Sequence, residues 1–404
     1  MGFFQRVKKN CGVCISAAMK DLETRKLSRR WTAINWIGES SSITGTDAIA
    51  FPGLGAETRN PNNRKWRDEK TEIETFYKRL ACVLENLPPS AEPEGKFFAL
   101  NEKLSIPELV KRLVTLPEIA HKLGMDTLKS FSEIYRKPEI KHQPNAGRWT
   151  GWFMADGDEV GKHLTNLAKK TNGDEAIRQF SQAMRDWGKN FSDKFPKELG
   201  RVIYAGGDDF LGVIYSEQDK PPIKLQQAFQ WLTTIPKQWE QHQQNIGLSL
   251  GFVWAAHSVP QRDILQHCRQ AEKVSKNSGR GRVTIRIVFN SGQYIQWTCP
   301  WDYLDILNKY QDREQQKNWS HIYQYFAQLQ SRRAFNFDPK TSLNNFPLEF
   351  FDIYFPGEGK KLLNHQFAQS IVGFGEEEDS RQPLIDWISD LIQVGWHLQE
   401  SPAK

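Results

Sequence analysis

The sequence predicts an α+β fold centred on a sheet between about residues 148 and 295. Two observations support this prediction. Strand-like and helix-like patterns follow one another in this range in the order strand, helix, helix, hairpin, helix, strand, helix, strand. In addition, two of the apolar runs end in turns that carry pairs of aspartates, Asp156 with Asp158 and Asp208 with Asp209.

Each central element has its own local pattern. The apolar run from Trp149 to Ala155 indicates a buried strand, and Val283, Ile285 and Ile287 recur at the period of two that is typical of a strand. The predicted strands are 149–155, 201–205, 210–216, 246–255 and 282–290. The predicted helices are 161–170, 175–195, 225–239 and 261–276. This order favours a ferredoxin-like sheet with helices on one face, the plan of the palm domains of nucleotide polymerases and cyclases.

The flanking regions divide the chain into three predicted domains. They are an N-terminal mixed region (1–147), the palm domain (148–295) and a C-terminal helical bundle (296–404). Apolar residues recur at helical steps in residues 68–86, in a helix that starts after Ser105, and in residues 301–310, 319–329 and 384–396. The stretch 143–147, Gln-Pro-Asn-Ala-Gly, indicates a linker between the first two domains.

The composition indicates a globular protein without a membrane segment. The hydrophobic content is 39%, yet no run approaches the roughly 20 apolar residues that cross a bilayer, and the N-terminus lacks a signal-peptide pattern. The five cysteines, Cys11, Cys14, Cys82, Cys268 and Cys299, are odd in number and scattered. They favour a reducing compartment over a disulfide framework, so we expect a cytoplasmic protein. The net charge of +6 permits contact with RNA or nucleotides without requiring it.

The aspartate pairs are the candidates for chemistry. Nucleotidyl transfer uses two divalent ions that hold the attacking and the leaving oxygen, and Mg²⁺ prefers carboxylate ligands. In an antiparallel sheet of the predicted order the first strand lies beside the hairpin, so Asp156 and Asp158 can converge with Asp208 and Asp209. Each pair alone is also typical of an ordinary turn. Their joint position at the ends of neighbouring strands favours a metal site.

Glycines and lysines beside these pairs fit a substrate that carries phosphates. Gly206 and Gly207 permit positive φ in a tight turn and let phosphate oxygens approach the backbone. Lys273 and Lys276 lie near the end of the predicted helix 261–276, where a lysine can hold a triphosphate. The same two lysines are equally explained by the favourable interaction of cations with the C-terminal end of a helix.

Several motifs resemble those of one protein family. The segments Phe153 to Lys162 and Arg201 to Asp209, which contain Asp-Gly-Asp and Gly-Gly-Asp-Asp, look like the large palm-domain subunit of type III CRISPR effector complexes. Further similar segments are 256–260, 271–276, 283–286, 291–292 and, for the III-B-like branch of the family, 104–113. The resemblance implies metal-dependent synthesis of cyclic oligoadenylate second messengers from ATP. It also implies an RNA-guided antiviral complex with other effector subunits, guide RNA and target RNA as partners.

The resemblance further implies roles for individual residues. Asp156, Asp208 and Asp209 would be the catalytic residues and would hold two Mg²⁺ or Mn²⁺ ions, with ATP as the substrate. The nucleotide would contact Gly157, Asp158, Gly206, Gly207, Lys273 and Lys276. Of the two lysines, Lys276 is the better candidate for the triphosphate. Asp158 would contact the metal ligands without binding the metal itself. The attacking group would be a ribose hydroxyl and the leaving group pyrophosphate.

The sequence departs from the family pattern in two places. Family members often begin with an HD nuclease domain, whereas no His-Asp dipeptide occurs here, so we expect a chain that lacks this domain and has no DNase activity. They also carry a four-cysteine zinc site, of which only Cys11 and Cys14 have ligand-like spacing here, so we expect at most a remnant of it. Two alternatives to the synthase are a non-catalytic scaffold subunit of the same complex and a stand-alone palm-type nucleotide cyclase. The intact acidic residues disfavour the first, and Asp209, where a diguanylate cyclase usually carries Glu, disfavours the second.

Overall fold

The computed structural model of the chain describes residues 20–21, 24, 39–45, 47–51, 64–95, 101–125, 134–136, 147–217, 219–335, 345–373 and 381–399. These residues divide into two compact units, one within residues 21–131 and the other formed by residues 1–20 and 132–404, and each is described by itself. The predicted domain boundaries after residues 147 and 295 stay predictions. Cys11 and Cys14 lie outside the described residues, so the remnant zinc site stays a prediction as well.

Among its described residues, the smaller unit includes three helices whose ends are defined. They are α3 (Arg64–Leu84), α4 (Ile106–Leu113) and α5 (Pro117–Lys122), of which the first two confirm the predicted helices. α4 begins after Ser105, whose amide donates a 2.7 Å hydrogen bond to Oε2 of Glu108, as in a capping box. The buried core of this unit consists of Ile49, Ile73, Tyr77, Ala81, Leu84 and Leu104.

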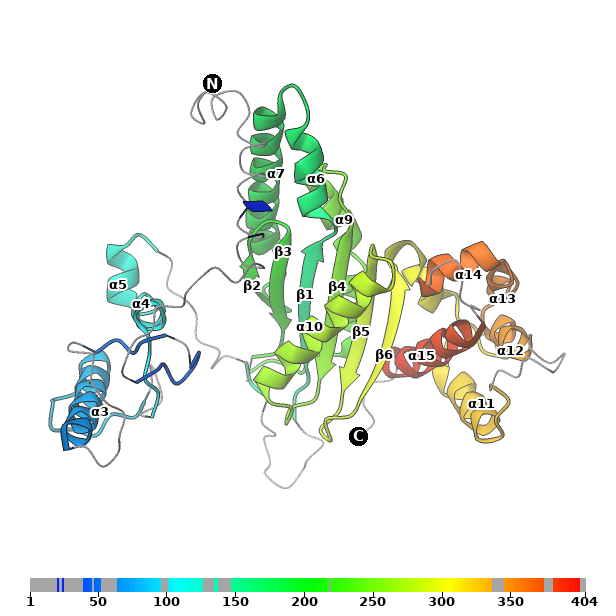
Figure 1. The fold of residues 1–404 in the computed structure, drawn as a ribbon. Coiled ribbons are helices and arrows are strands. Elements are labelled where there is room, and N and C mark those ends of the chain that lie inside the picture. The colour runs from blue at the N-terminus through cyan, green and yellow to red at the C-terminus, as the bar shows by residue number, and fades with distance from the viewer. Residues whose placement is uncertain are drawn as a thin grey trace. The chain divides into compact units, whose positions relative to one another are not determined.

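The larger unit contains a six-stranded sheet with the strand order β2-β3-β1-β4-β5-β6 (Figure 1). The strands are β1 (Thr150–Gly157), β2 (Gly200–Ala205), β3 (Asp209–Ile214), β4 (Leu248–Ala255), β5 (Arg282–Val288) and β6 (Tyr294–Pro300). All neighbouring strands are antiparallel except β4 and β5, which are parallel. The first five strands confirm the predicted α+β order, and β1 lies beside the hairpin strand β3, as expected.

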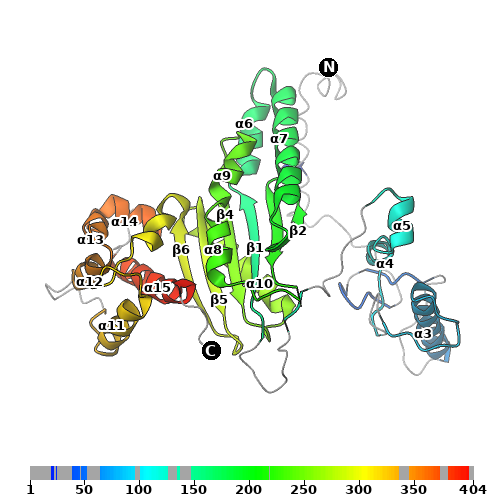
Figure 2. The same cartoon turned by 180° about the vertical axis from the view of Figure 1, so that it is seen from behind.

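Helices cover both faces of this sheet, so the expectation of a single covered face was wrong. They are α6 (Val160–Ala168), α7 (Gly173–Lys194), α8 (Leu225–Leu232), α9 (Ile235–Trp239) with the short 3₁₀ helix η3 (Glu240–His242), and α10 (Gln261–Asn277). Successive residues of a strand point to opposite faces. Trp152 and Val253 therefore pack with Cys268 of α10, whereas Phe153 and Phe252 belong to a second cluster with side chains of α7 and α8. Figures 1 and 2, which view the unit from opposite sides, show α10 in front of the sheet and α8 behind it.

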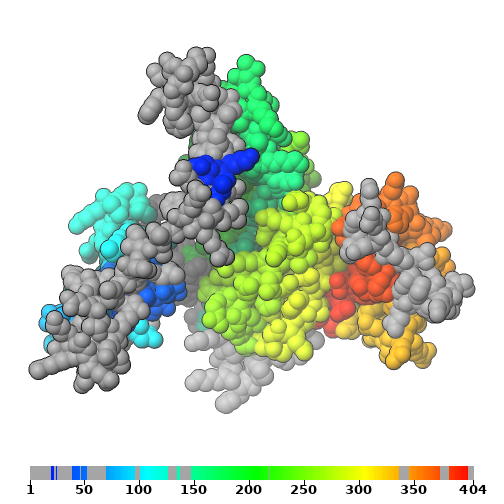
Figure 3. All heavy atoms as spheres, viewed as in Figure 1, coloured from blue at the N-terminus to red at the C-terminus, as the bar shows by residue number. Residues whose placement is uncertain are grey.

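The chain after β6 is helical, as predicted for the C-terminal region. Its elements are the 3₁₀ helix η4 (Trp301–Lys309), α11 (Trp319–Ser331), α12 (Phe346–Tyr354), α13 (Glu358–Leu362), α14 (His365–Val372) and α15 (Arg381–Gln399). Helix α15 is joined to the sheet, because Nε1 of Trp387 donates a 2.8 Å hydrogen bond to the carbonyl of Thr298 on β6. In the space-filling view the yellow-green side chains of α10 and the following strands form one surface, next to the orange and red atoms of these helices (Figure 3). Within the described ranges, no helix has the length and apolar character needed to cross a membrane.

Candidate active site

The strand register brings three of the predicted aspartates together at one end of the sheet. Asp156 on β1 and Asp209 on β3 are direct partners across neighbouring antiparallel strands. Directly opposed residues of such a pair point to the same face and have Cβ atoms about 4.5–5.5 Å apart. Asp208 is held next to them, because the amide of Gly157 donates a 2.7 Å hydrogen bond to the carbonyl of Asp208. The convergence expected for these residues is therefore present.

The turn that carries Asp208 requires its glycines. Gly207 has a φ of +118°, which residues with a side chain rarely adopt. At Gly206 a Cβ atom would lie 1.8 Å from the hydroxyl oxygen of Tyr204. The amide of Gly206 donates a 2.9 Å hydrogen bond to the carbonyl of Asp209, which closes the turn. Two successive residues beside the carboxylates thus carry no side chain of their own, and the Tyr204 hydroxyl lies against the first of them.

The electrostatics of Asp208 are those of a crowded carboxylate. Burial raises the pKa of Asp208, and the negative charges of Asp156 and Asp209 raise it further, while the positive charge of Lys276 acts in the opposite direction. Among the residues that the structure describes, no three Asp, Glu, His or Cys side chains already stand in a metal-binding arrangement. The donor set nevertheless fits Mg²⁺ or Mn²⁺, because it consists of carboxylate oxygens whose mutual repulsion a cation would relieve.

Lys276 on α10 is the cation closest to this cluster in the described part of the chain. Its Nζ lies 2.6 Å from Oδ2 of Asp156 and 2.5 Å from Oε1 of Glu272. A Cβ at Gly251 on β4 would lie 2.5 Å from the backbone of α10, so only glycine lets the helix lie this close to the strand. Although burial acts against it, the hydrogen bonds to Asp156 and Glu272 raise the pKa of Lys276. Lys273, by contrast, is exposed, and it forms no ion pair with these carboxylates.

Two residues of the site were missed in the sequence. Tyr204 on β2 donates a 3.0 Å hydrogen bond from its hydroxyl to Oδ1 of Asp209, and this bond raises the pKa of the tyrosine. Nothing in the local sequence distinguishes this tyrosine from any other strand residue. Glu272 lies four residues before Lys276, the spacing at which oppositely charged side chains meet on a helix, and that spacing is the signal that would have found it.

Asp158 lies apart from the other three carboxylates and has a different set of partners. It is buried, with 8% of its surface exposed. Its Oδ1 accepts a 2.7 Å hydrogen bond from the hydroxyl of Ser249, and its Oδ2 accepts a 2.9 Å hydrogen bond from the amide of Gly281. Asp158 thus joins the end of β1 to β4 and to the loop between α10 and β5. Neither of these partners is one of the three clustered aspartates, so the role of Asp158 in supporting the metal ligands stays a prediction.

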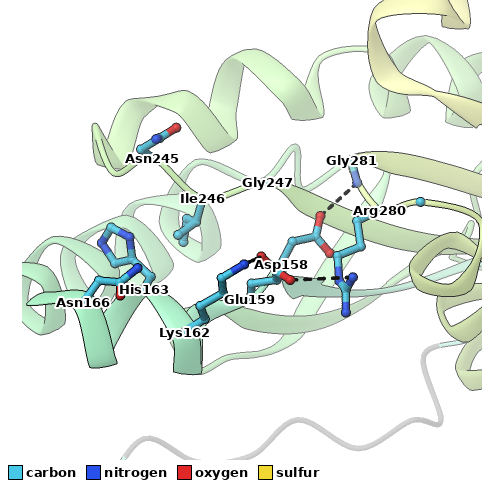
Figure 4. Close-up of a pocket in the computed structure, with 11 residues that line it drawn as sticks. Asp158, Glu159, Lys162, His163, Asn166, Asn245, Ile246, Gly247, Arg280 and Gly281 are labelled. Carbon is cyan, nitrogen blue, oxygen red and sulfur yellow. Dashed lines mark hydrogen bonds and ion pairs between the residues drawn. The ribbon is translucent and has the colours of Figure 1, made fainter. Parts of the chain in front are cut away.

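A polar pocket of about 610 Å³ opens beside Asp158 (Figure 4). It lies between the start of α6, the segment before β4 and the loop between α10 and β5, and Lys162, His163 and Arg280 are among its lining residues. Glu159 pairs with two of them, at 3.3 Å from Nζ of Lys162 and at 3.8 Å from Nη1 of Arg280. Figure 4 shows the side chains of Lys162, Glu159 and Arg280 side by side along its wall. The pocket therefore has polar walls and two cations, and it adjoins the strand end that carries Asp156.

Comparisons with known proteins find one family model and several solved structures that match the chain. Residues 149–284 match the family model of Cas10/Cmr2, second palm domain. Solved structures that match the chain include a Csm1–Csm4 cassette in complex with cA4 (15% identity, TM-score 0.39), the cassette with one ATP (15%, 0.38) and a Csm1–Csm4 subcomplex of the type III-A CRISPR-Csm interference complex (16%, 0.38). Each match covers 66% of this chain and 40% of the other chain, so this chain spans less than half the length of those relatives. The comparison with curated proteins finds no match. Residues 149–284, which include strands β1 to β4 and the start of β5, are thus similar to the second palm domain of Cas10/Cmr2.

Proposed function

We propose that this palm domain is a metal-dependent nucleotidyltransferase that joins ATP molecules into cyclic oligoadenylates. The observation that carries the proposal is the position of Asp156 opposite Asp209, with Asp208 in the adjoining turn. The match to the second palm domain of Cas10/Cmr2 supports the class of reaction.

The carboxylates of Asp156, Asp208 and Asp209 would hold two Mg²⁺ or Mn²⁺ ions. Ions bound there would lower the pKa of the attacking ribose hydroxyl and offset the charge of the leaving pyrophosphate. Lys276, whose Nζ lies 2.6 Å from Oδ2 of Asp156, would hold the triphosphate. Gly206 and Gly207 have no Cβ, so phosphate oxygens could approach this backbone once the exposed Tyr204 side chain turns away from Gly206.

The pocket beside Asp158 would accept a further part of the nucleotide. Lys162 and Arg280 supply the positive charge that an anionic ligand needs, and their partner Glu159 is a half-exposed side chain that can release them. Asp158 would act on the ligand indirectly, through the loop that its carboxylate holds.

We also propose that the chain works inside an RNA-guided type III effector complex, with other effector subunits, guide RNA and target RNA as partners. This part of the proposal rests on the resemblance of the Asp-Gly-Asp and Gly-Gly-Asp-Asp segments to the large subunit of such complexes.

Mass spectrometry of the products from ATP tests the proposal. The chain is incubated with ATP and Mg²⁺ or Mn²⁺, alone and in the reconstituted complex with guide-paired target RNA. The double variant Asp208→Ala/Asp209→Ala should make no oligoadenylate, whereas Asp186→Ala, which changes an exposed carboxylate on α7, should match the wild type. Product from the chain alone would instead favour a stand-alone cyclase. Absence of oligoadenylate from the complete complex would refute the synthase and favour a scaffold subunit.

A further inference from the structure

The loop between α10 and β5 connects the C-terminal helices to the candidate active site. On the basis of the proposed function, we infer that Arg282 is a positioning residue. It fixes the loop Gly279–Gly281 between the C-terminal end of α14 and Asp158. The C-terminal helices thereby set how tightly the pocket beside Asp158 binds ATP.

The first step is the contact of Arg282 with α14. The side chain is buried, with 5% of its surface exposed, and its guanidinium donates hydrogen bonds of 2.9 Å to the carbonyl of Ile371 and 3.2 Å to that of Ser370. The last carbonyls of a helix have no partner within the helix and carry its partial negative charge, so a cation is favoured there. A planar guanidinium can reach two such carbonyls and still donate elsewhere, which an ammonium on a single stem cannot do in the same geometry.

The second step is the direct contact of the end of α14 with the loop. Gly373 caps this helix with a φ of +80°, and a Cβ atom there would lie 1.6 Å from the carbonyl oxygen of Ser278. The neighbour is backbone and not the tip of a flexible side chain, so any larger residue would push the helix and the loop apart. The end of α14 and the start of the loop are therefore in contact because residue 373 is a glycine.

The third step leads from the loop to the active site. Nε of Arg282 donates a 3.1 Å hydrogen bond to the carbonyl of Arg280. This bond fixes the backbone of the loop to the side chain of Arg282. Gly279, Arg280 and Gly281 all have positive φ, at 113°, 63° and 58°, so the loop has an unusual conformation that its surroundings must maintain. Within this conformation the amide of Gly281 donates to Asp158, and the side chain of Arg280 lines the pocket and pairs with Glu159. If the loop moved away from α14, the contact with Asp158 and the ion pair with Glu159 would both be lost.

The electrostatic environment agrees with this connection. Burial lowers the pKa of Arg282, and the negative charges of Asp302 and Asp158 act in the opposite direction. The guanidinium and the Asp158 carboxylate therefore interact favourably, in addition to the hydrogen bonds through the loop backbone.

A pair of glycine substitutions separates this role from general stabilisation. Gly373→Ala keeps Arg282 in the sequence and places a Cβ 1.6 Å from the carbonyl oxygen of Ser278 and 3.1 Å from Nη1 of Arg282. Gly357→Ala is the matched control, because Gly357 has nearly the same φ (+79°), lies in the same group of helices, and would place its Cβ in open space. Both variants carry the same backbone strain, and only the first disturbs the loop. Arg282→Lys is the second test, since it keeps the charge and removes the three-way hydrogen bonding.

Three quantities are measured on the full chain: the exchange rate of the Gly281 amide by hydrogen–deuterium exchange without nucleotide, the Kd for ATP with Mg²⁺, and the Tm. In Gly373→Ala we expect faster exchange at Gly281 and ATP binding weaker by about tenfold, the loss expected for one charge-assisted hydrogen bond. We expect Gly357→Ala to match the wild type in both, with a Tm lowered less than that of Gly373→Ala, because it carries the backbone strain without the clash. For Arg282→Lys we expect an exchange rate at Gly281 and a Kd for ATP between those of Gly357→Ala and Gly373→Ala.

The role assigned to Arg282 is overturned if two quantities, the exchange rate of the Gly281 amide and the Kd for ATP, are the same in Gly373→Ala and Arg282→Lys as in the Gly357→Ala control. Failure of the proposed function gives a different result, because then the wild type itself binds no ATP. The exchange of the Gly281 amide still tests the connection in that case, since it is measured without nucleotide.

Discussion

Replacing Lys276 by glutamine removes the cation that lies 2.6 Å from Asp156 and 2.5 Å from Glu272. The three side chains are 32%, 37% and 15% exposed, so solvent screens part of the interaction. An exposed ion pair contributes about 0.2–1 kcal/mol, and a charge-assisted hydrogen bond in a more buried setting about 1.5–3 kcal/mol. We therefore expect Lys276→Gln to lower the free energy of unfolding by about 1–2 kcal/mol at neutral pH.

Thermal unfolding followed by circular dichroism measures this loss. For a domain of this size, 1 kcal/mol corresponds to a change in Tm of roughly 2–4 °C. Lys273→Gln is the matched control, because it removes the same charge from the exposed side of the same helix. Equal changes in Tm for the two variants would refute the assignment of Lys276 as the partner of the carboxylates.

The same pair of variants tests whether a divalent cation binds the carboxylates. Without Lys276 the negative charges of Asp156, Asp208 and Glu272 have lost their nearest described cation, so Mg²⁺ should bind there more tightly. Adding Mg²⁺ should then raise the Tm of Lys276→Gln by more than it raises the Tm of Lys273→Gln. If Mg²⁺ stabilises both variants equally, these carboxylates are not where it binds.

Three further predictions follow from individual residues. Because its folded pKa is raised, Asp208 contributes stability only at low pH, and this is lost as the pH rises through the folded value. Asp208→Asn should therefore have a Tm about 1–3 °C above that of the wild type near pH 7, with the difference disappearing below about pH 4. Burial, and then the charge of Asp386, raises the pKa of Asp390 to about 7. Because this pKa is also raised, Asp390→Asn should have a free energy of unfolding on the order of 2 kcal/mol above that of the wild type near pH 8.5, and no higher near pH 4. Denaturant titration at the two pH values measures this difference. A variant as stable as the wild type at both pH values would contradict the prediction. In the smaller unit, Oε2 of Glu108 accepts hydrogen bonds of 2.7 Å from the Ser105 amide and 2.6 Å from the Ser41 hydroxyl. Glu108→Ala should cost about 1 kcal/mol in urea unfolding, and the exposed Glu118→Ala close to nothing.

The strands that carry the aspartates could be predicted because each has a local signal. An apolar run ends at Asp156, and a pair of glycines separates the two strands of the hairpin. Strand β6 was not predicted, although Ile295, Trp297 and Cys299 alternate in it. This alternation is as regular as that of Val283, Ile285 and Ile287 in β5, so the sequence does contain a signal for β6 that the prediction overlooked.

The aspartates and Lys276 could be assigned to one site, but the contacts that the aspartates make could not be predicted. Lys276 meets Asp156, and Gly281 meets Asp158, across more than 100 residues of intervening chain. Both contacts depend on where α10 lies on the sheet. That position follows from the parallel pairing of β4 with β5 and from the close approach at Gly251, which are properties of tertiary packing. For the same reason the sequence could not indicate that α10 lies on the face opposite to α7 and α8.

The most direct test of the central claim is a titration with Mn²⁺ in the presence of ATP, followed by electron paramagnetic resonance. The claim is that Asp156, Asp208 and Asp209 together hold the divalent ions of a nucleotidyl transfer site. We predict that the wild type binds Mn²⁺ and that Asp156→Asn, Asp208→Asn and Asp209→Asn each weaken this binding at least about tenfold, while Asp186→Asn on α7 leaves it unchanged. Unchanged Mn²⁺ binding in the three site variants would contradict the claim.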